Sequence, residues 1–187
     1  MKTIKTSEDY ILSSKDILFF DTNIWLNLFL PTGTKENKET KEKIKKVSRI
    51  YKDVCEKSIK VYISSIVVSE FFNRYLRLMF DAEYSEDPSR YPNKDFKKEF
   101  KGTEEYVKYV NDIIEVLETN ILPNTELLDD NFNRFTLKEF KEKRNIRYYD
   151  FNDFYIHKLC KDKNLLVVTG DNDFMMANSG VNVLIVR

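Results

Sequence analysis

Four acidic side chains occupy positions from which a sheet protein could carry out chemistry. Asp21 and Asp171 each follow an apolar run, and Glu70 lies in a helical pattern that begins directly after another such run. Asp153 lies near the start of the helical pattern that precedes the run before Asp171. In an open α/β sheet, sites form beyond the carboxyl ends of the strands. A parallel sheet would therefore bring these four carboxylates to one edge.

Carboxylates gathered at one edge repel each other strongly unless a cation neutralises them. Ligand sets made only of oxygen atoms select hard ions such as Mg²⁺ or Mn²⁺ rather than Zn²⁺. Such a site is suited to phosphoryl transfer, because the metal can generate hydroxide and stabilise the leaving oxygen. We therefore expect Asp21, Glu70, Asp153 and Asp171 to be catalytic metal ligands, with Mg²⁺ or Mn²⁺ as the cofactor.

Continuous apolar runs predict the strands that would position these acids. Runs of Val, Ile, Leu and Phe suit strands that are buried on both faces, as in a parallel sheet. A weaker run at 121–122 is either a fifth strand or the end of a helix. The four clear runs are 17–20, 61–63, 165–168 and 183–186.

Helical patterns fall between the apolar runs. Strands that alternate with helices imply βαβ units, so we expect a single α/β domain over residues 1–187 with a parallel sheet flanked by helices. The polar segment 81–101, which contains two prolines, breaks this alternation and is expected to be an insertion or a mobile flap. The expected helices cover 36–58, 65–80, 104–120 with Thr103 as N-cap, a short helix with Thr136 and Glu139 in a capping-box pattern, and about 152–161.

The charge is balanced overall but uneven along the chain. There are 31 basic and 31 acidic residues, so the total does not indicate a strongly basic nucleic-acid binder. Residues 35–60, however, hold ten Lys and Arg against five Asp and Glu, which gives either a solvated helix face or an RNA track. The polar start lacks the apolar core of a signal peptide, and no run is long enough to span a membrane, so we expect a cytoplasmic protein.

Four segments together resemble the signatures of PIN-domain nucleases. The first is Phe-Phe-Asp-Thr-Asn-Ile-Trp-Leu at 19–26, and the second is Ser-Ser-Ile-Val-Val-Ser-Glu-Phe at 64–71. The third begins at Asp153, and the fourth is Thr-Gly-Asp at 169–171 after an apolar run. The separation of 18 residues between Asp153 and Asp171 is the usual one in this family. Each segment alone is a weak signal, but all four occur in order.

The resemblance implies a Mg²⁺- or Mn²⁺-dependent phosphodiesterase that acts on RNA. It also implies a three-layer fold with about five parallel strands flanked by helices. Many members of the family are the toxin half of a toxin–antitoxin pair, and homodimers are common among them. The implied partners are therefore an RNA substrate, an antitoxin protein and a second copy of the chain, without a membrane.

Neighbouring acids compete with two of the expected ligands. Either Asp150 or Asp153 would be favoured near a helix start by the helix dipole alone. The family spacing to Asp171 selects Asp153, which leaves Asp150 as a cap or an outer partner. Asp171 lies closer to the strand end than Asp173, which we expect to be a possible further ligand.

Several polar residues near the acids have two interpretations. Asn23 either positions Asp21 or a metal-bound water, or caps a helix, and Thr169 either orients a carboxylate or ends a strand. Arg74 and Arg77 share the polar face of Glu70, where they either meet a phosphate or remain in solvent. His157 is the only histidine, and we expect it at the surface.

Two other function classes remain as alternatives. A phosphatase of the haloacid-dehalogenase type also opens with a strand and an aspartate, but it needs a second acid two residues later. Asn23 occupies that place here. A non-catalytic RNA- or protein-binding module on the same fold would be marked by a missing acid, whereas all four acids are present.

Overall fold

A six-stranded, all-parallel sheet forms the centre of the computed structural model. The structure describes residues 4–7, 9–31, 38–129, 132, 136–141, 150–176 and 180–186. The α/β fold with a parallel sheet is thus confirmed, with one strand more than the five expected. The strands, in the order β1-β6-β5-β2-β3-β4, are β1 (Ile4–Thr6), β6 (Asn182–Ile185), β5 (Leu166–Thr169), β2 (Ile17–Phe20), β3 (Lys60–Ser64) and β4 (Glu126–Leu128).

The two outermost strands are the ones that the apolar runs did not predict. β1 and β4 have three residues each, and Leu127 of β4 is 72% exposed. Edge strands need no continuous apolar run, because one side lacks a neighbour and solvent reaches their side chains. The weak run at 121–122 proves to be a helix end, where the π-helical turn η3 (Leu117–Ile121) leads into η4 (Leu122–Asn124).

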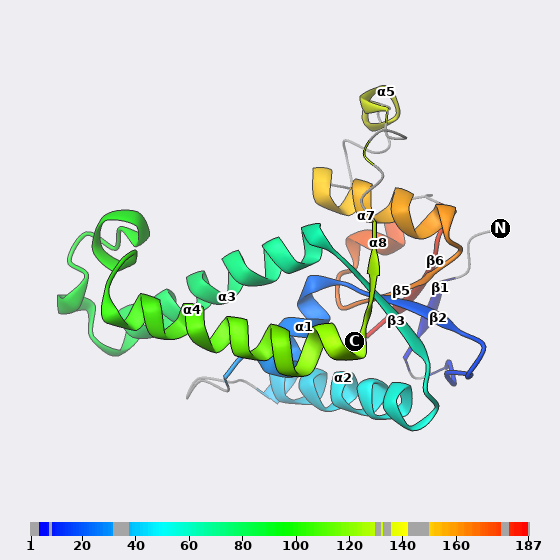
Figure 1. Cartoon of the computed structure of the whole chain (residues 1–187), viewed down its shortest axis with the longest axis horizontal. Helices are drawn as coiled ribbons and strands as arrows, with labels where there is room; N and C mark the ends of the chain where they lie inside the picture. The colour runs from blue at the N-terminus through cyan, green and yellow to red at the C-terminus, as the bar shows by residue number, and fades with distance from the viewer. Residues whose placement is uncertain are drawn as a thin grey trace.

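Helices cover both faces of the sheet. Figure 1 shows α2 on one side of the strands and α7 on the other. The only tryptophan, Trp25, is completely buried, and its ring lies 5.1 Å from Phe20 of the sheet and 6.2 Å from Tyr51 of α2. The helices are α1 (Thr22–Phe29), α2 (Lys38–Glu56), α3 (Ser65–Glu86), α4 (Glu104–Val116), α5 (Leu137–Phe140), α7 (Phe151–Asp162) and α8 (Asp173–Met176).

The expected helices are present, with Thr103 as the N-cap of α4. Its hydroxyl oxygen accepts a hydrogen bond from the backbone N–H of Tyr106 at 3.1 Å. Thr136 is the N-cap residue of α5, but its side chain accepts no capping hydrogen bond from the backbone there. The helix that was expected to end near residue 80 continues to Glu86.

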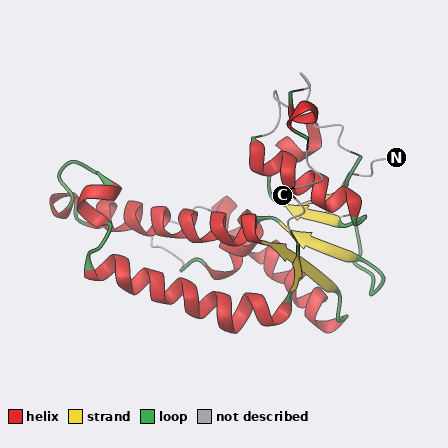
Figure 2. Cartoon of the chain, turned by 45° about the horizontal axis from the view of Figure 1, so that its top comes forward, coloured by secondary structure: helices red, strands yellow, loops and turns green. Residues whose placement is uncertain are grey.

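Together α3 and α4 form a long hairpin that projects away from the sheet (Figures 1 and 2). The segment 81–101 makes up its outer end, with η1 (Pro88–Arg90) and η2 (Phe96–Phe100) between the two helices. Phe100 is completely buried there, with ring centroids 5.2 Å from Phe80 and 5.5 Å from Phe96. This end of the hairpin therefore has an aromatic core of its own, and its assignment as an insertion or a flap stays a prediction.

Within the described part of the chain, no helix combines the length and the apolar character needed to cross a membrane.

Candidate active site

Adjacent strands β2 and β5 place two of the predicted segments side by side. Their register pairs Phe20 with Val168, and the backbone N–H of Asp21 continues the ladder by donating to the Val168 carbonyl oxygen at 3.0 Å. Asp21 and Thr169 consequently emerge together at the carboxyl edge of the sheet. Asp21 is also the N-cap of α1 and is only 6% exposed.

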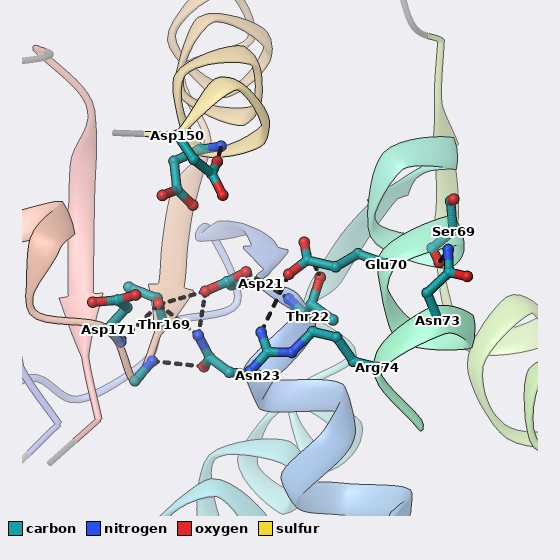
Figure 3. A network of polar contacts seen from close by, with 12 residues as sticks. Asp21, Thr22, Asn23, Ser69, Glu70, Asn73, Arg74, Asp150, Thr169 and Asp171 are labelled. Atoms are coloured by element: carbon teal, nitrogen blue, oxygen red, sulfur yellow. Dashed lines mark hydrogen bonds and ion pairs between the residues drawn. The ribbon is translucent and has the colours of Figure 1, made fainter. Parts of the chain in front are cut away.

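The Asp21 carboxylate is held by three hydrogen-bond donors (Figure 3). Its Oδ1 accepts from the backbone N–H of Thr22 at 2.6 Å. Its Oδ2 accepts from the hydroxyl of Thr169 at 2.6 Å and from the side-chain amide of Asn23. Sequence reasoning left capping and positioning open for Asn23, and here its amide contacts the carboxylate of Asp21. Asp21 itself both caps α1 and faces the other acids.

The same residues fix the turn that follows β5. The backbone N–H of Gly170 donates to Asn23 Oδ1 at 2.8 Å, and that of Asp171 donates to the Thr169 hydroxyl oxygen at 3.0 Å. Asp171 in turn accepts from the backbone N–H of Asp173 at 2.9 Å, and both of these acids are exposed. Asp171 is therefore linked to Asp21 through the hydroxyl of Thr169, and Asp173 is linked to Asp171.

Glu70 of α3 reaches the same edge from β3, the strand next to β2. Its Oε2 accepts from the hydroxyl of Thr22 at 3.0 Å, and its Oε1 faces Arg74 Nη1 at 3.2 Å. Thr22 thus links the two acids, because its backbone contacts Asp21 and its side chain contacts Glu70 (Figure 3).

Asp150 and Asp153 divide their roles at the start of α7. Asp150 is the N-cap residue, and its Oδ1 accepts from the backbone N–H of Asp153 at 2.9 Å. Asp150 is exposed, whereas Asp153 is half-buried in the first helical turn. Of the two alternatives for Asp150, a cap or an outer partner, the structure shows the cap.

Two of the acids, Asp21 and Asp153, have raised pKa values. Burial raises the pKa of Asp21 to about 6, with the charges of Glu70 and Asp171 adding to the effect of burial and the hydrogen bonds from Thr169 and Thr22 opposing it. Burial also raises the pKa of Asp153 to about 7, with contributions from Asp150, Asp21 and Asp171. Burial, with the charges of neighbouring acids added to it, therefore makes the ionised forms of Asp21 and Asp153 costly.

The carboxylate oxygens at this edge are ligands of the kind that a hard divalent ion prefers. All four acids offer oxygen atoms, and a bound cation would compensate the charge that raises the pKa of Asp21 and of Asp153. Among the described residues, however, no three His, Cys, Asp or Glu side chains are arranged so that they could hold one metal ion directly. The charges of these carboxylates act on one another, but the described side chains do not form a set of direct ligands around one ion.

Two other predicted residues lie apart from the acids. Arg77 is exposed, and its guanidinium lies 5.1 Å from the ring centroid of Phe96, at the outside of the aromatic core of the hairpin. His157 is buried rather than at the surface as expected, with its ring 4.5 Å from that of Phe174. This part of α7 is covered nearly all round, since every position from Phe154 to Cys160 except Lys158 is buried.

Lys43 also lies at this edge, although the sequence did not single it out. Lys43 of α2 donates from Nζ to the carbonyl oxygen of Gly170 at 3.3 Å. The lysine content of residues 35–60 gave the only sequence signal, and it did not distinguish Lys43 from the lysines around it.

Comparisons with known proteins come from structures, curated sequences and family models. A crystal structure of FitAcB from Neisseria gonorrhoeae aligns with 90% of this chain and 96% of that chain, at 22% identity and a TM-score of 0.48. No curated protein matches the sequence significantly. The PIN domain model matches residues 18–177, a range that includes all four predicted acids. The chain therefore belongs to the PIN domain family.

Proposed function

We propose that this protein is a divalent-metal-dependent ribonuclease that hydrolyses phosphodiester bonds in RNA. PIN domains are typically nucleases that use a divalent metal. The observation that carries the proposal is the buried carboxylate of Asp21, which lies in the field of Glu70, Asp171 and Asp153 and has its pKa raised to about 6. A buried acid with like charges around it is expected at a metal site or a catalytic site.

In this proposal Asp21, Glu70, Asp153 and Asp171 hold Mg²⁺ or Mn²⁺, directly or through water, with Asp173 as a further ligand. When bound, the metal would lower the pKa of a water molecule and stabilise charge on the leaving oxygen.

The surrounding residues orient the acids. Thr169 and Asn23 donate hydrogen bonds to Oδ2 of Asp21. These bonds fix the orientation of the carboxylate at the end of β2. Thr22 holds Glu70 in the same way. Arg74 is exposed and pairs with Glu70, so its guanidinium would meet a phosphate of an approaching RNA strand.

The test is cleavage of a labelled single-stranded RNA with Mn²⁺ by the wild type and by Asp21→Asn. The amide keeps the size of the side chain but loses the charge, so we expect cleavage to fall by at least about a hundredfold. Asp162→Asn, at the far exposed end of α7, is the matched control and should cleave like the wild type. Near-normal cleavage by Asp21→Asn would exclude this assignment.

A finer form of the proposal is that the protein is the toxin of a toxin–antitoxin pair. It rests on the family and requires a small antagonist encoded beside this gene. Induced expression should then arrest growth for the wild type but not for Asp21→Asn, and coexpression of the neighbouring gene should restore growth. Unimpaired growth with active wild-type protein present would reject the toxin role and leave the nuclease assignment intact.

A further inference from the structure

Lys43 brings a positive charge to the rim of the acidic site. Its ammonium contacts the carbonyl oxygen of Gly170, the residue directly before Asp171. Lys43 is half-buried, and this contact holds its ammonium beside the end of β5. Among the residues that the structure describes, no carboxylate lies within ion-pair distance of it. The charge at this position is therefore available to a ligand.

The absence of a side chain at Gly170 makes room for Lys43. A Cβ atom built on Gly170 would lie 2.5 Å from Lys43 Cε and 2.6 Å from Lys43 Nζ. The same point is 3.2 Å from Asn23 Oδ1, whose amide nitrogen contacts Asp21. Lys43 and the Asp21 network thus flank one small space at the end of β5.

Lys43 is also the first of three basic residues that follow one another along α2. Lys46 and Arg49 come at intervals of three residues, so neighbouring members of the row adjoin each other while the row turns by about 60° at each step. Both line a hollow of about 540 Å³ between α2 and residues 7–12. A row of cations that begins at the carboxylates and continues into a hollow suits an extended polyanion.

We propose that Lys43 binds an RNA phosphate next to the scissile bond, and that Lys46 and Arg49 guide the adjoining strand along α2. This inference rests on the proposed nuclease function and extends it to the path of the substrate. An ammonium at a fixed position binds a phosphate as a point charge, and it does not depend on base identity. Binding along α2 is therefore expected to be independent of RNA sequence.

The experiment measures the affinity for a fluorescein-labelled single-stranded RNA by anisotropy in EDTA, so that no cleavage occurs. The salt dependence is recorded between about 50 and 200 mM KCl, where log affinity falls linearly with log salt. Lys43→Gln should make the slope shallower by about 0.7, the value for one phosphate contact on a single strand. Lys43→Arg retains the charge and should retain the slope.

Two further variants separate the phosphate contact from a structural role. Lys45→Gln removes an exposed charge two residues along α2, on the opposite side of the helix, and should change the slope much less. Gly170→Ala keeps every charge but displaces the Lys43 ammonium, so it should weaken RNA binding in the same direction as Lys43→Gln. Melting temperatures of all variants should stay close to that of the wild type.

Equal slopes for Lys43→Gln and Lys45→Gln would overturn the inference, as would the absence of RNA binding by the wild type. Lys43-dependent binding without cleavage in Mn²⁺ would support the binding site and remove the proposed function. Cleavage that depends on Asp21, combined with a salt slope that Lys43→Gln leaves unchanged, would support the proposed function and overturn the Lys43 site.

Discussion

Asp21 shows how a single residue can serve two purposes. As the N-cap of α1 it accepts a backbone hydrogen bond, and as a buried acid it lies in the field of Glu70 and Asp171. The hydrogen bonds favour its charged form, whereas burial and like charges oppose it. Because burial has the largest effect, Asp21 retains a proton more readily than an ordinary aspartate when no cation is nearby.

The Thr169 hydroxyl provides a test at this scale. Thr169→Val keeps the shape of the side chain but removes its donor to Asp21 Oδ2 and its acceptor for the Asp171 N–H. We expect Mn²⁺ affinity and RNA cleavage each to fall by about 10- to 100-fold, the usual effect of losing an outer partner of a metal ligand. Isothermal titration with Mn²⁺ measures the first effect. Unchanged Mn²⁺ affinity would mean that Thr169 only ends the strand.

At the scale of elements, strand order explains why distant segments converge. β2 lies between β5 and β3, so the residues that follow these three strands share one edge. α1 begins directly at Asp21, and α3 brings Glu70 to the same place because it leaves β3 without a loop. The site is therefore built on the rigid ends of strands and on the first turns of helices.

The α3–α4 hairpin is a separate element whose outer end rests on its aromatic core. Phe100→Ala should lower the free energy of unfolding of that end by about 3–5 kcal/mol, because it leaves a cavity where a fully buried ring was. Leu78→Ala, at a 41% exposed position of α3, is the control and should cost under about 1 kcal/mol. Hydrogen exchange at residues 88–103 measures the effect.

Arg90 stabilises the same end by pairing with Glu83 of α3 at 2.8 Å and with Glu105 of α4. Loss of Phe100 should therefore accelerate exchange mainly in this segment, and RNA cleavage should remain close to normal below the unfolding temperature. Unchanged exchange in Phe100→Ala would show that the ring does not hold the two helices together.

At the scale of the whole molecule, the acidic site makes stability depend on pH. Asp21 and Asp153 have pKa values of about 6 and about 7 in the folded protein, above the ordinary value of 3.8. Their protonated forms are therefore favoured by folding. This contribution is fully present below pH about 4 and is lost as the pH rises through about 6 to 7.

Metal-free protein in EDTA should accordingly melt at a higher temperature at pH 5 than at pH 8, with other carboxylates adding a smaller opposite trend at lower pH. Mn²⁺ at pH 8 should raise the melting temperature again, because a bound cation compensates the charges of the ionised acids. Asp21→Asn should flatten the pH dependence and weaken the response to Mn²⁺. A melting temperature that rises from pH 5 to pH 8 in EDTA would contradict the raised pKa values.

The sequence by itself determined the parts of the protein that depend on local pattern. Continuous apolar runs located the four inner strands, because strands covered on both faces carry mainly apolar side chains. The order of the four acidic segments predicts Asp21, Glu70, Asp153 and Asp171 as the site residues. The exposed edge strands β1 and β4 carry no comparable pattern, and only the pairing with their neighbours defines them.

Tertiary structure alone decided the contacts between segments that lie far apart in the chain. The bonds from Thr22 to Glu70 and from Thr169 to Asp21 join residues 48 and 148 positions apart, so no local pattern encodes them. Which lysine of α2 meets the site depends on how α2 packs against the sheet and on the missing side chain of Gly170. The physical reason is that packing sets the direction of each side chain, whereas local pattern sets only the element that carries it.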